Sequence, residues 1–91
     1  MKVLVLVTRS CGHRPILERY LAEMGIEHEV KYVEDHPGLQ ERFGVTTSPN
    51  LIVDDTLIFA GWPEAAELKA SLESLEARAR TERREEGPRK A

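Results

Sequence analysis

The sequence predicts an α/β domain in which helices flank a four-stranded mixed sheet, in the order β-α-β-α-β-β-α. Three observations support this: an uninterrupted apolar run at 3–7, apolar residues at helical spacing over 16–24, and apolar runs at 51–53 and 57–59 separated by a polar turn. An apolar run without alternation suits a central strand that is buried on both faces. A chain of 91 residues has room for one such domain and not for two.

The first helix is expected to follow the loop at 8–10 directly, with Ser10 as its side-chain cap and Cys11 in its opening turn. Gly25 stands where this helix should end. Residues 26–32 then alternate between apolar and polar side chains, which predicts a second strand. Because a helix joins them, these two strands should be parallel, with a right-handed crossover.

The second half of the chain predicts a short helix, a hairpin and a final helix. Residues 35–43 have Pro37 near the start and Gly44 directly after, as expected for a short helix. The polar residues 54–56 separate the two runs that form the hairpin. From Ala65 onward, apolar residues recur three or four positions apart, which indicates the last helix.

Charge divides the chain into an acidic body and a basic end. The formal net charge of -3 provides no basic face for nucleic acid and no polybasic patch for a membrane. We place the domain at 1–80 and expect 81–91 to be a charged, disordered tail, with docking to an acidic partner as the alternative.

The N-terminal apolar run is shorter than a signal peptide or membrane span, and a free thiol suits a reducing compartment. The protein is therefore expected in the cytoplasm.

Cys11 is the only cysteine, which excludes an internal disulfide and a cysteine-rich zinc site, and the three histidines are scattered. No metal is therefore expected. A thiol at the start of a helix meets unpaired backbone N–H groups and the positive end of the helix dipole. Arg9, His13 and Arg14 add positive charge nearby, so the sequence predicts an activated thiol. The alternatives are a small buried cysteine, a solvated His13, and an Arg14 that either binds an anionic substrate or faces solvent.

The tetrapeptide Cys-Gly-His-Arg at 11–14 resembles the active-site motif of the thioredoxin superfamily. Its first three residues match the Cys-Gly-His-Cys site of protein disulfide isomerase domains, with Arg14 in place of the second cysteine. Residues 36–53 resemble the thioredoxin segment that leads into its cis-proline strand, and 60–62 resemble the loop that borders the substrate surface. The chain lacks an extra N-terminal strand and helix, and is in this respect more similar to glutaredoxin than to thioredoxin.

This resemblance implies a substrate surface opposite the thiol. Pro49 would have a cis peptide bond and face Cys11, and the two residues before it would offer backbone groups to a bound peptide or thiol. The substrate-binding residues implied in this way are Thr47, Ser48, Pro49, Gly61 and Trp62.

The resulting hypothesis is a monothiol thiol-disulfide oxidoreductase with Cys11, His13 and Arg14 as catalytic residues. Its mixed disulfide must be resolved by an outside thiol, either glutathione as co-substrate or a thiol-bearing partner protein. One alternative is a non-catalytic binding module that docks a partner through the Pro49 edge and Trp62. A less favoured alternative is a glutaredoxin-like carrier whose dimer holds an iron-sulfur cluster together with glutathione.

Overall fold

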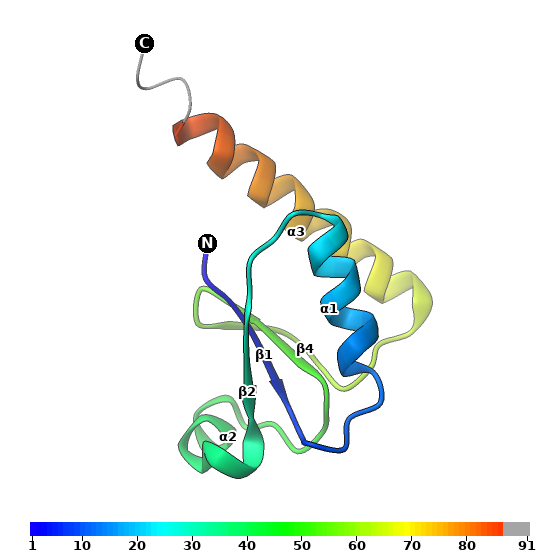
Figure 1. Cartoon of the computed structure of the whole chain (residues 1–91), viewed down its shortest axis with the longest axis vertical. Helices are drawn as coiled ribbons and strands as arrows, with labels where there is room; N and C mark the ends of the chain where they lie inside the picture. Colours follow the sequence, from blue (N-terminus) through cyan, green and yellow to red (C-terminus); the bar gives the residue numbers. More distant parts are fainter. Residues whose placement is uncertain (87–91) are drawn as a thin grey trace.

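The computed structural model describes residues 1–86 and forms one mixed sheet with helices on both faces (Figure 1). The elements are β1 (Val3–Val7), α1 (Arg14–Glu23), β2 (Glu29–Tyr32), the 3-10 helix η1 (Val33–Asp35), α2 (Pro37–Phe43), β3 (Asn50–Val53), β4 (Thr56–Ala60) and α3 (Ala65–Glu86). The strand order is β2-β1-β3-β4, in which only the β1–β2 pair is parallel. The predicted fold class, element order and mixed sheet are confirmed.

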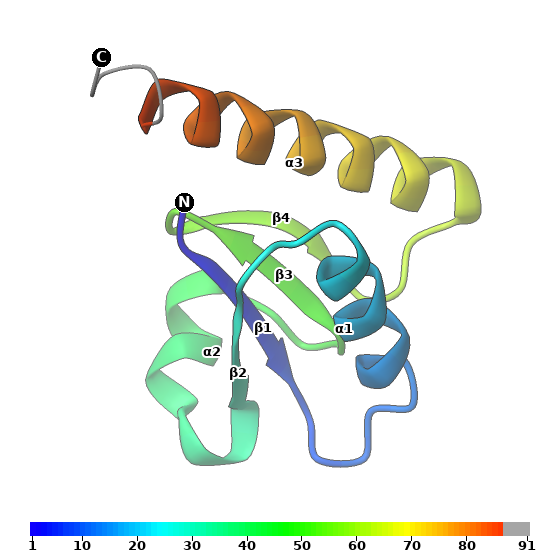
Figure 2. The same cartoon turned by 45° about the horizontal axis from the view of Figure 1, so that its top comes forward.

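Alternation along the strands builds two apolar layers. Val5 and Val7 pack with residues of α1 and α3, whereas Leu6 and Ile52 pack with residues of α2. Figure 2 shows α1 and α3 on one side of the sheet and α2 on the other. Because β1 is covered on both faces, four of its five residues are buried, as its uninterrupted apolar sequence predicts.

The start of α1 differs from the sequence-based expectation. Its N-cap residue is His13, whose side chain makes no capping hydrogen bond, so neither Ser10 nor Cys11 opens the helix. The reason is Pro15, which lacks the N–H that would donate to the carbonyl of Cys11. The helical bonds therefore start with the N–H of Leu17, which donates to the His13 carbonyl at 3.0 Å. Cys11 lies in the turn that precedes the helix.

The end of α1 shortens the second strand. Gly25 has a φ of 69°, and the N–H of Ile26 donates to the Leu21 carbonyl at 2.9 Å, which closes a Schellman motif. This turn uses the first residues of the segment 26–32 that was expected to be a strand. Consequently β2 begins only at Glu29, and His28 lies before the strand and not within it.

The β3–β4 hairpin turns at Asp54 and Asp55, which both have positive φ, as a two-residue hairpin loop requires. The last helix, α3, continues past the expected boundary at residue 80 to Glu86, since its charged residues are good helix formers. The remainder of the expected tail, residues 87–91, lies outside the described residues. Among residues 1–86, no helix has the length and apolarity needed to cross a membrane.

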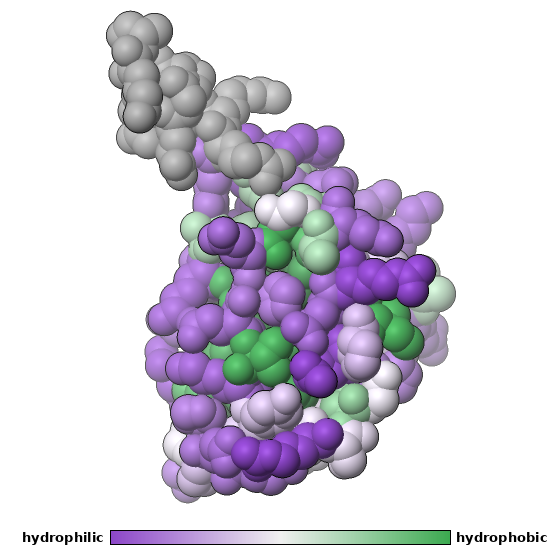
Figure 3. All heavy atoms as spheres, in the orientation of Figure 1, coloured by the Kyte–Doolittle hydropathy of each residue, from purple (hydrophilic) through white to green (hydrophobic). Residues whose placement is uncertain are grey.

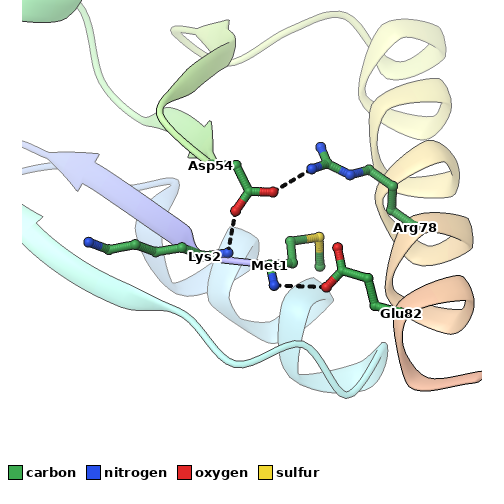
Figure 4. Close-up of polar contacts among 5 residues, drawn as sticks. All are labelled: Met1, Lys2, Asp54, Arg78 and Glu82. Atoms are coloured by element: carbon green, nitrogen blue, oxygen red, sulfur yellow. Dashed lines mark hydrogen bonds and ion pairs between the residues drawn. The ribbon is translucent and has the colours of Figure 1, made fainter. Parts of the chain in front are cut away.

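Polar contacts fasten α3 to the hairpin and to the start of the chain (Figure 4). The Asp54 carboxylate accepts a hydrogen bond of 2.7 Å from the N–H of Lys2 and forms an ion pair with Arg78 of α3. The ammonium of Met1 contacts Glu82 of the same helix at 2.7 Å. These contacts hold the second half of α3 against the end of the sheet at which β1 begins, opposite the end from which β1 leads to Cys11.

Candidate functional site

Cys11 lies in the loop between β1 and α1, beside the apolar core. Its side chain is half-buried and packs against the core layer that contains Val7 and Leu17. Its N–H donates to the Thr8 carbonyl at 3.2 Å, which closes the turn before the helix. The thiol is thus held in place without being sealed inside the core.

The segment before β3 is bonded to the loop of Cys11. The peptide bond between Ser48 and Pro49 is cis, and Pro49 is buried. Ser48 Oγ accepts a hydrogen bond of 3.1 Å from the N–H of Thr8, the residue whose carbonyl accepts from Cys11. Two hydrogen bonds through Thr8 therefore connect Cys11 with Ser48.

Asn50 joins β1 to the segment before β3, a role that the sequence did not reveal. The residue is fully buried, and its Nδ2 donates to the carbonyls of Leu6 at 3.0 Å and Thr47 at 2.7 Å. A buried amide is costly unless it is hydrogen-bonded, and these two bonds satisfy its donors. Within the described chain, Asn50 Oδ1 has no partner. The only sequence signal was a polar residue at the head of an apolar run.

Gly61 supports the segment 47–49 from the end of β4. Its N–H donates to the Pro49 carbonyl at 2.8 Å, and its φ of 78° lies in the left-handed region that favours glycine. A Cβ atom at this position would lie 3.2 Å from Thr47 Oγ1. Gly61 is therefore needed for the close approach between this loop and Thr47.

Trp62 contacts His13 at the start of α1. The imidazole and indole rings are stacked, with centroids 4.6 Å apart and planes 11° apart. The half-buried Trp62 also packs against the core layer that Cys11 contacts. The structure thus brings His13, Trp62 and the thiol to one end of the sheet, although the two aromatic residues lie far apart in the sequence.

Arg14 lies next to the stacked histidine, but its charge is compensated within α1. Its Nη1 donates to Glu18 Oε2 at 2.8 Å, one turn further along the helix. The other carboxylate oxygen of Glu18 lies 3.0 Å from Nε2 of His28. The guanidinium of Arg14 therefore pairs within α1 and makes no ion pair with the segment 47–49.

Arg9, on the other side of Cys11 in the chain, is also paired. Its Nη2 lies 2.5 Å from Asp35 Oδ2, and its guanidinium stacks over the Tyr32 ring at 4.9 Å. The hydrogen bond to Asp35 raises the pKa of Arg9 above its usual value. The backbone N–H of Arg9 donates to Glu34 at 3.1 Å. The loop of Cys11 is thus anchored to η1 by both charge and hydrogen bonding.

Among the described residues, a groove between two helices lies apart from the candidate site. A groove of about 350 Å³ between α1 and α3 is lined mainly by apolar atoms of helix residues, and by none of the site residues above. Figure 3 shows small, separate hydrophobic groups on a largely hydrophilic face. Nowhere in residues 1–86 do three or more histidine, cysteine, aspartate or glutamate side chains gather in a way that could hold a metal ion.

The chain belongs to the thioredoxin domain family, which it matches over residues 1–73. Its fold is similar to that of thioredoxin 1 from the thermophilic eubacterium Thermosipho africanus TCF52B, with a TM-score of 0.65 and 20% sequence identity. That match covers 88% of this chain and 99% of the other. No curated protein sequence matches the chain. The expected thioredoxin superfamily is confirmed, and it indicates a thiol-disulfide redox function with thiol-bearing protein partners in general.

Proposed function

We propose that this protein is a monothiol thiol-disulfide oxidoreductase that acts through Cys11. The observation that supports this most directly is the half-buried thiol in a loop bonded through Thr8 to Ser48, beside Pro49. With a single cysteine, the chain cannot form an internal disulfide. An outside thiol must therefore complete each cycle.

The proposed reaction has two exchange steps. The Cys11 thiolate attacks one sulfur of a disulfide, so that a bond to Sγ forms as the original S–S bond breaks, and the released thiolate takes a proton from solvent. A thiolate from glutathione or a partner protein then attacks the substrate sulfur of the mixed disulfide. Cys11 leaves as thiolate, and a disulfide forms between the two outside sulfurs.

The residues around Cys11 have distinct parts in this proposal. The backbone groups of Thr47 and Ser48 align an extended substrate, and the hydrogen bond from Asn50 to the Thr47 carbonyl holds this segment in place. Pro49 and Gly61 fix the shape of this segment through their backbone hydrogen bond. The stacked rings of His13 and Trp62 form a flat wall beside it. Arg14 stabilises the first turn of α1 through its pair with Glu18. A free thiol of this kind is suited to a reducing cytoplasm.

Intact-mass spectrometry tests the proposal. The purified chain is mixed with 2-hydroxyethyl disulfide, and one mixed-disulfide adduct per chain is expected on Cys11. Added 2-mercaptoethanol should remove the adduct and restore the free thiol, and the Cys11→Ser variant should give no adduct. In a coupled assay, the wild type should also speed the reduction of a peptide disulfide by the same thiol. A wild-type rate equal to that of Cys11→Ser would contradict the oxidoreductase.

The stack of Trp62 on His13, next to the hydrogen bond between Gly61 and Pro49, favours a second candidate, the non-catalytic binding module. This arrangement exists whether or not the sulfur reacts. In a binding module, Cys11→Ser would retain partner affinity and Trp62→Ala would lose it. In an oxidoreductase, Cys11→Ser abolishes turnover even where the fold is intact.

A further inference from the structure

Charged groups surround the cysteine loop in a specific arrangement. Each of the two flanking arginines is held by a carboxylate of the chain itself: Arg14 by Glu18 at 2.8 Å, and Arg9 by Asp35 at 2.5 Å. A third carboxylate, that of Glu34, accepts from the backbone N–H of Arg9 at 3.1 Å. The loop therefore has two compensated cations and one additional negative charge.

We propose that the Cys11 site selects disulfides that have neutral or cationic neighbouring groups, and disfavours anionic disulfides. The proposal rests on the oxidoreductase function given above. An arginine with no partner would recognise a substrate carboxylate by a bidentate contact. Here such a carboxylate must displace Glu18 or Asp35 from its arginine, and it also meets the charge of Glu34. Disulfides flanked by lysine or arginine in a partner protein fit this site, whereas oxidised glutathione belongs to the disfavoured class.

Glu18 is the specificity-determining residue in this proposal. Its carboxylate neutralises Arg14, the cation that lies within the same turn as the stacked His13, and it is itself held by His28 at 3.0 Å. Removing its charge leaves Arg14, three residues after Cys11 in the chain, without its ion-pair partner. The preference for cationic substrates should then weaken, because opposite charges within about 8–10 Å still interact at ordinary ionic strength.

Three symmetrical disulfides with identical two-carbon arms test the preference. Cystamine is a dication, 2-hydroxyethyl disulfide is neutral, and 3,3′-dithiodipropionate is a dianion. The rate of mixed-disulfide formation on Cys11 is measured for each, and divided by the rate of the same disulfide with thioglycerol, a neutral thiol that differs from all three leaving groups, to remove intrinsic reactivity. The normalised rates should fall in the order cystamine, hydroxyethyl disulfide, dithiodipropionate, and the differences should shrink with added salt.

Variants then locate the cause. In Glu18→Gln, the ratio of the cystamine rate to the dithiodipropionate rate should fall by about threefold or more at low ionic strength. Glu34→Gln should also lower this ratio of rates. The control is Glu73→Gln, the same chemical change at an exposed position within α3, which should leave the ratio unchanged.

The outcomes separate the two proposals. Equal normalised rates for the three disulfides, or a ratio that Glu18→Gln does not move, would overturn the charge selectivity and leave the oxidoreductase intact. Failure of all three disulfides to react with Cys11 would overturn the oxidoreductase itself. Circular dichroism spectra identical to wild type show that a variant is folded, so that an altered ratio reports the site.

Discussion

The imidazole ring of His13 lies flat against the indole ring of Trp62, with 4.6 Å between the ring centroids. His13 is the N-cap residue of α1, and Trp62 lies in the connection between β4 and α3. The stack therefore joins the segment that follows Cys11 to the segment that follows Gly61. These two parts of the candidate site are far apart in the sequence, and no hydrogen bond of the sheet connects them.

This stack should contribute measurable coupling to stability. In a double-mutant cycle of His13→Ala and Trp62→Ala, we expect a coupling free energy of about 0.5–1.5 kcal/mol, the range for stacked aromatic pairs. Urea unfolding followed by circular dichroism measures it, since Trp62 is the only tryptophan and cannot serve as a probe. The same cycle with His36 in place of His13 is the control and should show no coupling. A His13–Trp62 value within error of this control would contradict the structure.

Gly61→Ala should destabilise the protein by about 1–2 kcal/mol, because the left-handed conformation is unfavourable for a residue with a Cβ atom. The new Cβ would also lie 3.2 Å from Thr47 Oγ1 and press on the segment 47–49. Urea unfolding measures the loss, and the rate of Cys11 with 2-hydroxyethyl disulfide should fall with it. Gly38→Ala is the matched control: a Cβ there meets nothing within 4 Å and lies inside α2, so stability should hold or rise. Equal losses in the two variants would count against the proposed role of Gly61.

The fold was predictable because burial determines where apolar residues stand along a strand or helix. The uninterrupted run at 3–7 identified the central strand, and the spacing over 16–24 identified α1. The start of this helix was predicted wrongly, although the sequence contained the signal: Pro15 removes the N–H that Cys11 would need as a partner. A missing donor changes a helix boundary without changing the apolar pattern.

The candidate site was less predictable, since its contacts depend on tertiary structure. The pair of Arg14 with Glu18 has the helical i, i+4 spacing and was available from the sequence. The pair of Arg9 with Asp35 forms only when β1 and β2 lie side by side. Asn50 gave only a weak signal, as a polar residue at the head of an apolar run, because the role of a buried amide is recognised only when the carbonyls that it bonds are known.

Asp54 should make the stability depend on pH. The hydrogen bond from the N–H of Lys2, and to a lesser extent the positive charges of the Met1 ammonium and of Arg78, lower the pKa of this carboxyl below its usual value of about 4. A carboxyl with a lower pKa in the folded state stabilises the protein above the unfolded-state pKa, and this contribution is lost as the pH falls through the folded-state pKa. Asp54→Asn should therefore destabilise the protein at pH 7, and the difference from wild type should narrow in acid.

Urea unfolding at a series of pH values measures this difference. Asparagine tolerates the left-handed φ of 49° at this position, so that the substitution reports mainly the charge. Arg78→Gln is the control, because it removes the ion pair and keeps the hydrogen bond from Lys2. Most of the pH dependence should survive in this variant. A constant difference between Asp54→Asn and wild type at all pH values would rule out the proposed linkage.

Pro15→Ala should extend α1 toward Cys11. An alanine at this position supplies an N–H that can donate to the Cys11 carbonyl, the bond that the proline ring excludes. We expect the Cα chemical shifts of Gly12 and His13 to become helical, and the amide introduced by the substitution to be protected from hydrogen exchange. Adding Gly12→Ala should strengthen the effect, since a Cβ there meets nothing within 4 Å and alanine favours the helix by about 1 kcal/mol.

The same extension tests how the helix start influences the thiol. With Cys11 at the N-cap, the unpaired N–H groups of the first turn lie closer to the sulfur, and attack on 2-hydroxyethyl disulfide should speed up about two- to fivefold. Pro37→Ala, at the first residue of another helix, α2, is the control and should change neither the shifts nor the rate. If the shifts become helical and the rate stays the same, the distance between the helix start and Cys11 does not limit its reactivity. If the shifts do not move, Pro15 is not what sets the first residue of α1.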